Sequence, residues 1–185
     1  MKKFKDYFLT GFTLVLTAIV LYLILSDPPM RYKNNKEFIQ DVNKCATHIE
    51  RTLKKEQRID RMLLLTQAAL ESNYGRSRYA IEGNNLMGIY MFSNLENGIL
   101  PNGRNKNAKF RVAKFKTKCD SVRYYVKLLN FNDNYKALRV ERERQIKLKI
   151  EAPKAYFTLL YNYSTNPDYP KLLYRTYNEI KDMGF

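Results

Sequence analysis

The chain consists of segments with a helical spacing of apolar residues on either side of one central segment that lacks it. Between residues 36 and 53 apolar side chains recur every three or four positions, which predicts an amphipathic helix. An apolar helix ending at Glu71 follows, and then a short helical turn over residues 77–82. Further helices are expected to begin at Asp120, Asp133, Pro153 and near Pro170.

The helical period disappears between Tyr90 and Lys118. Pro101-Asn102-Gly103 is a strong turn signal, and the apolar residues of 108–115 stand among basic ones, which suits a β-ribbon. The sequence therefore predicts an α+β domain over residues 36–185, mostly helical with a small β-hairpin lobe. From Arg104 to Lys118 the chain has seven Lys or Arg and no acid. This is either a solvated edge that resists aggregation or one wall of an anion-binding groove.

The N-terminal segment has the pattern of a membrane anchor. Lysines in residues 1–5 precede an uncharged apolar run from Tyr7 to Ser26. Twenty residues at about 1.5 Å each span a hydrocarbon core of about 30 Å. No cleavage site of the kind that ends a signal peptide precedes Asp27-Pro28-Pro29. We therefore expect a transmembrane anchor over residues 1–26 and a linker over residues 27–35.

Composition narrows the choice of partners. A chain of 185 residues that is 45% hydrophobic can bury one core, and its net charge of +15 favours a polyanionic partner. No nucleic-acid-binding motif is present, so nucleic acid is the least favoured of these partners. The only histidine, His48, lies on the polar side of its helix, which leaves neither a histidine-based catalytic site nor a metal site. Cys45 and Cys119 form either one disulfide or two buried thiols.

Glu71 occupies an electrostatically unfavourable position for a carboxylate. On a period of 3.6 residues it lies on the same stripe as Leu64 and Ala68, at the negative end of its helix, and Gly75 is expected to close that helix. The apolar surroundings and the helix dipole are both expected to raise the pKa of Glu71. A carboxylic acid that is protonated near neutral pH can serve as a general acid, whereas the alternative is a solvated glutamate at a helix end.

Several segments in one order resemble a known family. Residues 69–77 (ALESNYGRS) and 83–89 (GNNLMGI) resemble its "ALES-W-G-S … NNLFGI" signature. Residues 108–112 lead into a similar central block, and residues 163–169 (YSTNPDY) resemble its "YATDP-Y" motif. The family is that of the bacterial β-N-acetylglucosaminidases of glycoside hydrolase family 73, and the resemblance is closest to its Bax-like branch. The resemblance covers residues 37–183. Any one block would be a weak signal, but three blocks in the same order are specific to the family.

The resemblance implies a lysozyme-like fold and an enzyme that cleaves the glycan strands of peptidoglycan at N-acetylglucosamine, without a cofactor or a metal. Glu71 matches the catalytic acid, and Tyr163 matches a tyrosine that positions the substrate or stabilises the transition state. Tyr74 stands where the family usually has a tryptophan, which predicts stacking on a sugar. Asn85 and Tyr90, in and directly after the second motif, complete the expected substrate-binding residues.

The second catalytic group is less well marked. Glycosidases normally use two carboxylates. Glu96 is the only acid between Gly83 and Asp120, so it is the candidate by elimination, although it also fits a turn. The acetamide group of the substrate could act as the nucleophile instead. Asp120 and Asp168 are better explained as helix caps.

The leading hypothesis is a peptidoglycan hydrolase held at the membrane by its N-terminal helix, with the catalytic domain outside the cytoplasm. Its expected partners are the glycan strands and the membrane, with regulatory envelope proteins as a further class. A lytic transglycosylase would need the same single acid but would use the sugar's own hydroxyl in place of water. A catalytically inactive module for wall binding or envelope assembly would need no acid with a raised pKa.

Overall fold

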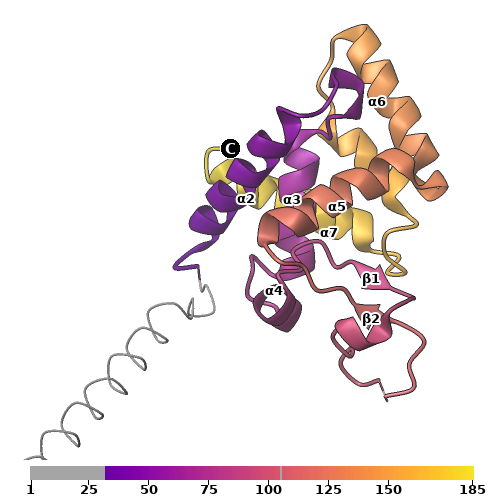
Figure 1. The fold of residues 1–185 in the computed structure, drawn as a ribbon. Helices are drawn as coiled ribbons and strands as arrows, with labels where there is room; N and C mark the ends of the chain where they lie inside the picture. The colour runs from indigo at the N-terminus through magenta and orange to yellow at the C-terminus, as the bar shows by residue number, and fades with distance from the viewer. Residues whose placement is uncertain (1–31, 105) are drawn as a thin grey trace, which may run out of the picture. The chain divides into compact units, whose positions relative to one another are not determined.

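The computed structural model describes residues 32–104 and 106–185 (Figure 1). Their helices and strands follow in the order α2 (Asn35–Glu50), η1 (Lys55–Gln57), α3 (Arg61–Ser72), α4 (Arg78–Gly83), β1 (Tyr90–Met91), η2 (Leu95–Asn97), β2 (Arg111–Val112), α5 (Lys118–Phe131), η3 (Asp133–Tyr135), α6 (Lys136–Leu148), η4 (Pro153–Leu160) and α7 (Tyr169–Asp182), where η marks a 3₁₀ helix. The predicted α+β class, mostly helical with a small sheet, is therefore confirmed.

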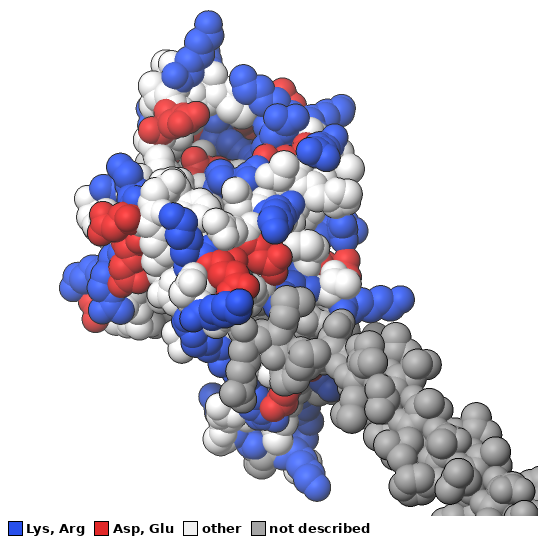
Figure 2. Space-filling view, turned by 90° about the vertical axis from the view of Figure 1, so that its left-hand side faces the viewer, with Lys and Arg blue, Asp and Glu red and all other residues white. Residues whose placement is uncertain are grey.

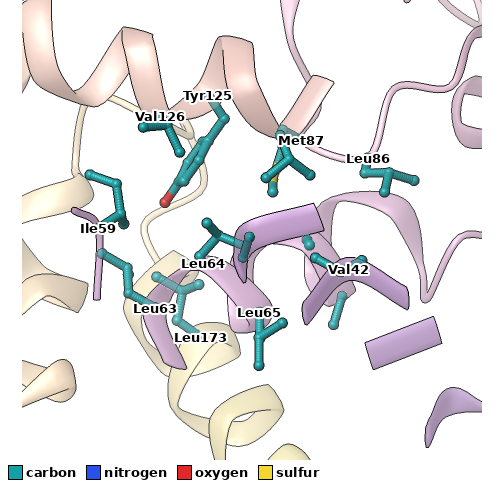
Figure 3. Close-up of a cluster of buried hydrophobic side chains, with 14 of the residues drawn as sticks. Val42, Ile59, Leu63, Leu64, Leu65, Leu86, Met87, Tyr125, Val126 and Leu173 are labelled. Atoms are coloured by element: carbon teal, nitrogen blue, oxygen red, sulfur yellow. The ribbon is translucent and has the colours of Figure 1, made fainter. Parts of the chain in front are cut away.

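Helix α3 is the central element, and α2, α7 and η4 pack against it (Figure 1). The three consecutive leucines Leu63, Leu64 and Leu65 are all buried, so the helix is covered on several sides. Figure 3 shows side chains of α3 together with Tyr125 from α5 and Leu173 from α7. Each fully buried leucine contributes about 2 kcal/mol to stability. This packing fixes α3, and with it the residue in its last turn, Glu71.

Helix α2 has the predicted buried stripe. The buried residues of α2 are Phe38, Ile39, Val42, Cys45, Ala46 and Ile49. The helix begins after Asn34, whose side chain accepts a hydrogen bond from the Glu37 backbone N–H at 2.8 Å. A disulfide joins Cys45 to Cys119 of α5, with 5.1 Å between their Cα atoms. Of the two alternatives for the cysteines, the structure has the bridge, while His48 is exposed as predicted.

The predicted β-hairpin is present, but its strands are only two residues long. Strands β1 and β2 are antiparallel, with Tyr90 opposite Val112 and Met91 opposite Arg111, and Ile99 also bridges to Val112. The sheet lies at the opposite end of the described part from the C-terminal end of α6 (Figure 1). In the connection between the strands the chain turns at residues 102 and 103. Pro101 has no N–H and so cannot extend the ladder of hydrogen bonds.

One helix begins earlier than the sequence predicts, and another is of a different type. Helix α5 begins at Lys118, before Asp120, because Thr117 caps it: the Thr117 hydroxyl accepts from the Asp120 backbone N–H at 3.2 Å, and the Asp120 carboxylate accepts from the Thr117 N–H at 3.1 Å. In this capping box Asp120 is the third helical residue. The segment that Pro153 opens is the 3₁₀ helix η4, where an α-helix was expected.

The predicted membrane anchor, residues 1–26, lies outside the described residues. Within 32–104 and 106–185 no helix is both long and apolar enough to cross a membrane. The folded unit includes part of the predicted linker, since Tyr32 is buried, packs edge-on against Phe38 with 5.0 Å between ring centroids, and donates a hydrogen bond to Asp41 at 2.8 Å.

Candidate active site

Glu71 is the penultimate residue of α3, and an unusual turn follows it. Asn73, Tyr74 and Gly75 all have left-handed backbone conformations, with φ of 50°, 52° and 76°. The left-handed region therefore begins two residues before the glycine that was expected to close the helix. A side chain at position 75 would be 2.5 Å from the ring of Tyr32, so only glycine fits. Consecutive residues in this sparsely populated region are typical of functional sites.

The two carboxyl oxygens of Glu71 have different surroundings. Oε1 accepts a hydrogen bond from the Tyr169 hydroxyl at 2.6 Å. Oε2 faces Gly88, where a Cβ atom would be only 2.7 Å away. Burial raises the pKa of Glu71 to about 7, because the Tyr169 hydrogen bond, which favours the charged form, offsets only part of the effect. The predicted direction of the pKa shift is confirmed, and burial is its main cause.

A chain of hydrogen bonds behind Glu71 fixes the direction of the Tyr169 hydroxyl. The Tyr125 hydroxyl donates to Oε1 of Gln67, and Nε2 of Gln67 donates to the Tyr169 oxygen at 2.9 Å. Because the Tyr169 oxygen accepts this N–H, its own hydrogen is directed to Oε1 of Glu71. A proton bound by Glu71 must then lie on Oε2, the oxygen that faces Gly88.

Tyrosines surround the carboxylate. Burial is the largest cause that raises the pKa of Tyr125, Tyr135, Tyr163 and Tyr169, and the negative charge of Glu71 raises each further. The rings of Tyr163 and Tyr169 are stacked, with 6.2 Å between centroids and 7° between planes. The Tyr163 hydroxyl donates to the Met87 carbonyl at 2.5 Å. The structure thus brings the predicted residue Tyr163 beside Tyr169, the residue that donates a hydrogen bond to Glu71.

An exposed aromatic surface on the β-lobe extends from this site. Tyr90 and Phe92 are 52% and 76% exposed, and both rings contact Phe110, at 5.2 and 6.3 Å between centroids. We call these three residues the aromatic platform. Burial, Tyr79 and then Glu71 raise the pKa of Tyr90, which places it within electrostatic range of the acid. The Arg104 guanidinium lies 5.8 Å from the centroid of Phe110. Exposed rings of this kind suit the apolar faces of sugars.

Two predicted substrate-binding residues have structural roles instead. Tyr74 is only 8% exposed, packs edge-on against Phe38, and donates a hydrogen bond to Glu179 at 2.8 Å, so the faces of its ring lie in the core. Asn85 is buried and both ends of its amide are occupied: Nδ2 donates to the Ile89 and Ala113 carbonyls, each at 2.9 Å, and Oδ1 accepts the Ile89 N–H at 3.0 Å. Asn85 therefore shapes the turn that carries Gly88 and leads into β1.

The three acids considered as a second catalytic group are Glu96, Asp120 and Asp168, and their surroundings differ from those of Glu71. Glu96 is exposed on η2, where its carboxylate accepts a hydrogen bond from the Asn97 side chain at 3.3 Å. Asp120 is held by Thr117 and by Arg123 at 2.6 Å, as a capping residue is. Asp168 directly precedes α7 and forms an ion pair with Lys171 at 2.8 Å. Within 32–104 and 106–185, no second acid is hydrogen-bonded to Glu71, and Glu71 is the only acid bonded to Tyr169.

Sequence reasoning missed the residues that support Glu71 from behind. Gln67 lies four positions before Glu71 in an apolar helix, so a polar residue on the buried stripe was the available signal. Tyr169 ends the third matched block, although no role was assigned to it. No spacing pattern connects Tyr125 to Gln67, because the two residues are 58 positions apart in the chain. In the described ranges, no cluster of three or more histidine, cysteine or acidic side chains could hold a metal ion.

Comparison with known proteins agrees with this geometry. Residues 46–182 match the sequence model of the glucosaminidase family, which is described as mannosyl-glycoprotein endo-β-N-acetylglucosaminidase. The fold is similar to the crystal structure of the catalytic domain of the autolysin Auto from Listeria monocytogenes, with a TM-score of 0.56 and 19% sequence identity over 90% of this chain and 94% of that one. A search of curated proteins gives no match.

The family match covers most of the chain, including Glu71, the turn at Gly88 and the segment with Tyr163 and Tyr169. The similarity to the Auto domain confirms the expected lysozyme-like fold, with its mostly helical body and two-stranded sheet. Assignment to the Bax-like branch stays a prediction from the sequence. The chain is an endo-β-N-acetylglucosaminidase that belongs to the glucosaminidase family, glycoside hydrolase family 73.

Proposed function

We propose that this enzyme hydrolyses the glycan strands of peptidoglycan at N-acetylglucosamine, with Glu71 as the general acid. The observation that carries the proposal is the state of Glu71: one carboxyl oxygen is held by Tyr169 at 2.6 Å, the other faces Gly88, and the pKa is about 7. Such an acid holds its proton over much of the neutral range and can still release it to a leaving group.

The proton leaves from Oε2 and binds the glycosidic oxygen as the bond to the sugar ring breaks. Positive charge then develops on the ring, the leaving sugar departs with the proton from Glu71, and water adds to the ring carbon. The hydrogen bond from Tyr169 to Oε1 strengthens as Glu71 becomes charged, because a hydroxyl donates more strongly to a carboxylate than to a neutral acid. Tyr163 and the aromatic platform orient the sugars on either side of the cleaved bond.

For the second catalytic group we retain two candidates. Glu96, on the exposed helix η2, is the only acid between Gly83 and Asp120, and its carboxylate would activate water. The acetamide group of the substrate would serve without any second carboxylate. A Glu96→Gln variant separates them: activity falls by about 10²-fold or more if Glu96 acts as the base and stays near the wild-type level if the acetamide acts.

We place the catalytic domain outside the cytoplasm, anchored by residues 1–26. The disulfide between Cys45 and Cys119 supports this location, because such bridges persist in oxidising compartments and are rare in the cytosol. The Auto domain, similar in fold, is named as part of an autolysin. The net charge of +15 favours the negatively charged surface of a cell wall.

The test is digestion of purified peptidoglycan by the full-length protein in detergent, with the released fragments identified by mass spectrometry. We expect reducing-end N-acetylglucosamine from the wild type and about 10²- to 10⁴-fold slower release from Glu71→Gln, which removes the acid. Anhydro-muramic ends would identify a lytic transglycosylase. Binding without any fragment release would identify a catalytically inactive wall-binding module, and either result would reject the proposed reaction.

A further inference from the structure

A buried arginine far from Glu71 has most of its hydrogen-bond donors unoccupied. Arg142 of α6 is only 7% exposed. Its Nη2 donates to Oδ1 of Asn130 at 2.7 Å, whereas Nε and Nη1 have no partner among the described residues. A buried cationic group without acceptors is costly, so such a group normally faces a ligand or a counter-ion.

Arg142 lines a cavity of about 360 Å³ between η1, the start of α3, the end of α6 and η4. The charged residues that line it are Lys55, Arg58, Lys149 and Arg142 together with Asp60 and Glu151. Four cations and two acids leave a formal charge of +2. Figure 2 shows Lys and Arg side chains, with Asp and Glu among them, at the upper end of the described part, at the height of the C-terminal end of α6 in Figure 1.

The acids in this cavity do not neutralise Arg142. Asp60 is the N-cap of α3, where its carboxylate accepts the Leu63 N–H at 2.8 Å. Glu151 is exposed, and no hydrogen bond or ion pair joins it to Arg142 in the described part of the chain. Nε and Nη1 of Arg142 therefore have no acceptor among the described residues, and Arg142 itself lines the cavity.

The walls that hold Arg142 are built from fully bonded amides. Asn130 accepts from Arg142 and donates from Nδ2 to the Gln57 carbonyl at 2.8 Å, which ties η1 to α5. On the other side, Gln145 donates to the Ala152 carbonyl at 3.1 Å and accepts the Ala152 N–H at 2.9 Å. Both contacts fix the segments that carry the cationic residues, so the cavity exists before any ligand binds.

We propose that this cavity binds a phosphate group. A tetrahedral oxyanion with up to two negative charges balances the formal charge of +2. Its oxygens can accept hydrogen bonds from the Arg142 guanidinium, a group whose planar set of donors suits phosphate. Lys55 and Arg58, exposed at the rim, supply further positive charge. The phosphate can be a free ion, a diester in a polymer or a lipid headgroup.

The site is separate from the glycosidase site. Asp60 and Glu71 lie at opposite ends of α3, so eleven residues, or about 16 Å of helix, separate them. A ligand in the cavity therefore leaves the carboxyl of Glu71 uncovered. The phosphate site does not depend on which glycan the enzyme cleaves, and its failure would leave the proposed hydrolysis untouched.

The test is isothermal titration of the full-length protein in detergent with inorganic phosphate, at constant ionic strength. We expect saturable binding with one ion per chain. The Lys55→Gln/Arg58→Gln double variant changes only exposed side chains, so it should fold normally, and its affinity should fall about tenfold. Arg142→Met should abolish binding. Arg144→Gln is the matched control, because Arg144 lies on the same helix but pairs with Glu141 outside the cavity, and it should bind as the wild type does.

The proposal is overturned if the wild type shows no saturable binding, if the rim double variant binds as tightly as the wild type, or if Arg144→Gln weakens binding equally. Titrations with poly(glycerol phosphate) and with glycerophosphorylglycerol, the headgroup of phosphatidylglycerol, identify the source of the phosphate by their affinity relative to the free ion. Acetate that competes with phosphate at equal concentration would show a general anion site, and this also overturns the proposal.

Discussion

If Glu71 is the general acid, as proposed, the Tyr169 hydroxyl should set the pH range over which it acts. Its hydrogen bond favours the charged form of Glu71 and so lowers the pKa of the acid, which burial raises to about 7. In Tyr169→Phe this donor is lost while the ring stays, and the pKa of Glu71 should rise. Since a general acid is active in its protonated form, the decline of kcat/KM at high pH should move to higher pH by about one unit.

The measurement is a pH profile of kcat/KM on soluble glycan fragments. Tyr174→Phe is the matched control, because the Tyr174 hydroxyl is bonded to Lys154 on the exposed face of α7, and its profile should coincide with that of the wild type. An unchanged profile in Tyr169→Phe would contradict the role of this hydroxyl, whereas a move to lower pH would mean that it stabilises the protonated acid.

Burial of Glu71 also makes stability depend on pH. The pKa of Glu71 is raised above its ordinary value of 4.5 to about 7, so the folded state holds the proton more tightly than the unfolded state. The cost of keeping the charged carboxylate buried is absent below pH 4.5 and grows until pH 7. Glu71→Gln should therefore raise the free energy of unfolding by about 2 kcal/mol at pH 8, after allowance for partial exposure, and by little at pH 4. Urea unfolding at both pH values checks this, and equal effects would contradict it.

At the scale of elements, the apolar periodicity was sufficient to place the helices. The stripes of α2 and α7 are buried at the predicted positions, among them Val42, Leu173 and Ile180, because a period of 3.6 residues admits one buried face. The errors lie at ends and in special turns. Three left-handed residues after Ser72 follow from packing against Tyr32 and Phe38, which local sequence does not encode.

The turn before β1 packs against the carboxyl group of Glu71, the proposed general acid. Gly88 has φ of 61°, and a Cβ atom there would be 2.7 Å from Oε2 of Glu71. Gly88→Ala must therefore displace the carboxyl group. We expect kcat to fall about 10²-fold, since a shift of about 1 Å in a catalytic group has an effect of this size. The measurement is the rate of glycan cleavage at saturating substrate.

Gly103→Ala provides the control for the backbone. Gly103 has a similar φ of 70°, but a Cβ atom there would have no neighbour within 4 Å. Both substitutions cost about 1 kcal/mol of backbone strain, and only the one at position 88 meets Glu71. Equal losses of activity in the two variants would mean that strain, and not contact with the acid, explains the effect.

At the scale of the whole molecule, the site is assembled from segments that are distant in the chain. The burial and the raised pKa of Glu71 were predictable, because a carboxylate on an apolar stripe is visible in the sequence. Tyr74 was misplaced, since an aromatic residue in a motif does not reveal whether its ring faces a ligand or the core, and here it packs on Phe38. The contacts of Gln67 with Tyr125 and Tyr169 span 58 and 102 positions, and only the folded chain defines them.

The disulfide joins α2 to α5 and so links two helices that are distant in the chain. Cys45 and Cys119 close a loop of 74 residues that contains Glu71, Gly88 and the whole β-lobe. Chain-entropy arguments give about 4 kcal/mol for a loop of this length. The Cys45→Ser/Cys119→Ser variant should lose stability of this size, and dithiothreitol should lower the urea midpoint of the wild type but leave that of the variant unchanged.

Because residues of α2 and α5 other than the two cysteines also pack against each other, the variant should keep its fold and its activity at low temperature. The loss of stability should therefore appear as unfolding at a lower urea concentration, with the pH profile of cleavage unchanged. A variant that is as stable as the oxidised wild type would contradict the argument, because the long loop would then contribute nothing to the entropy of the unfolded chain. A variant that is folded but inactive would instead show that the bridge positions Glu71 directly.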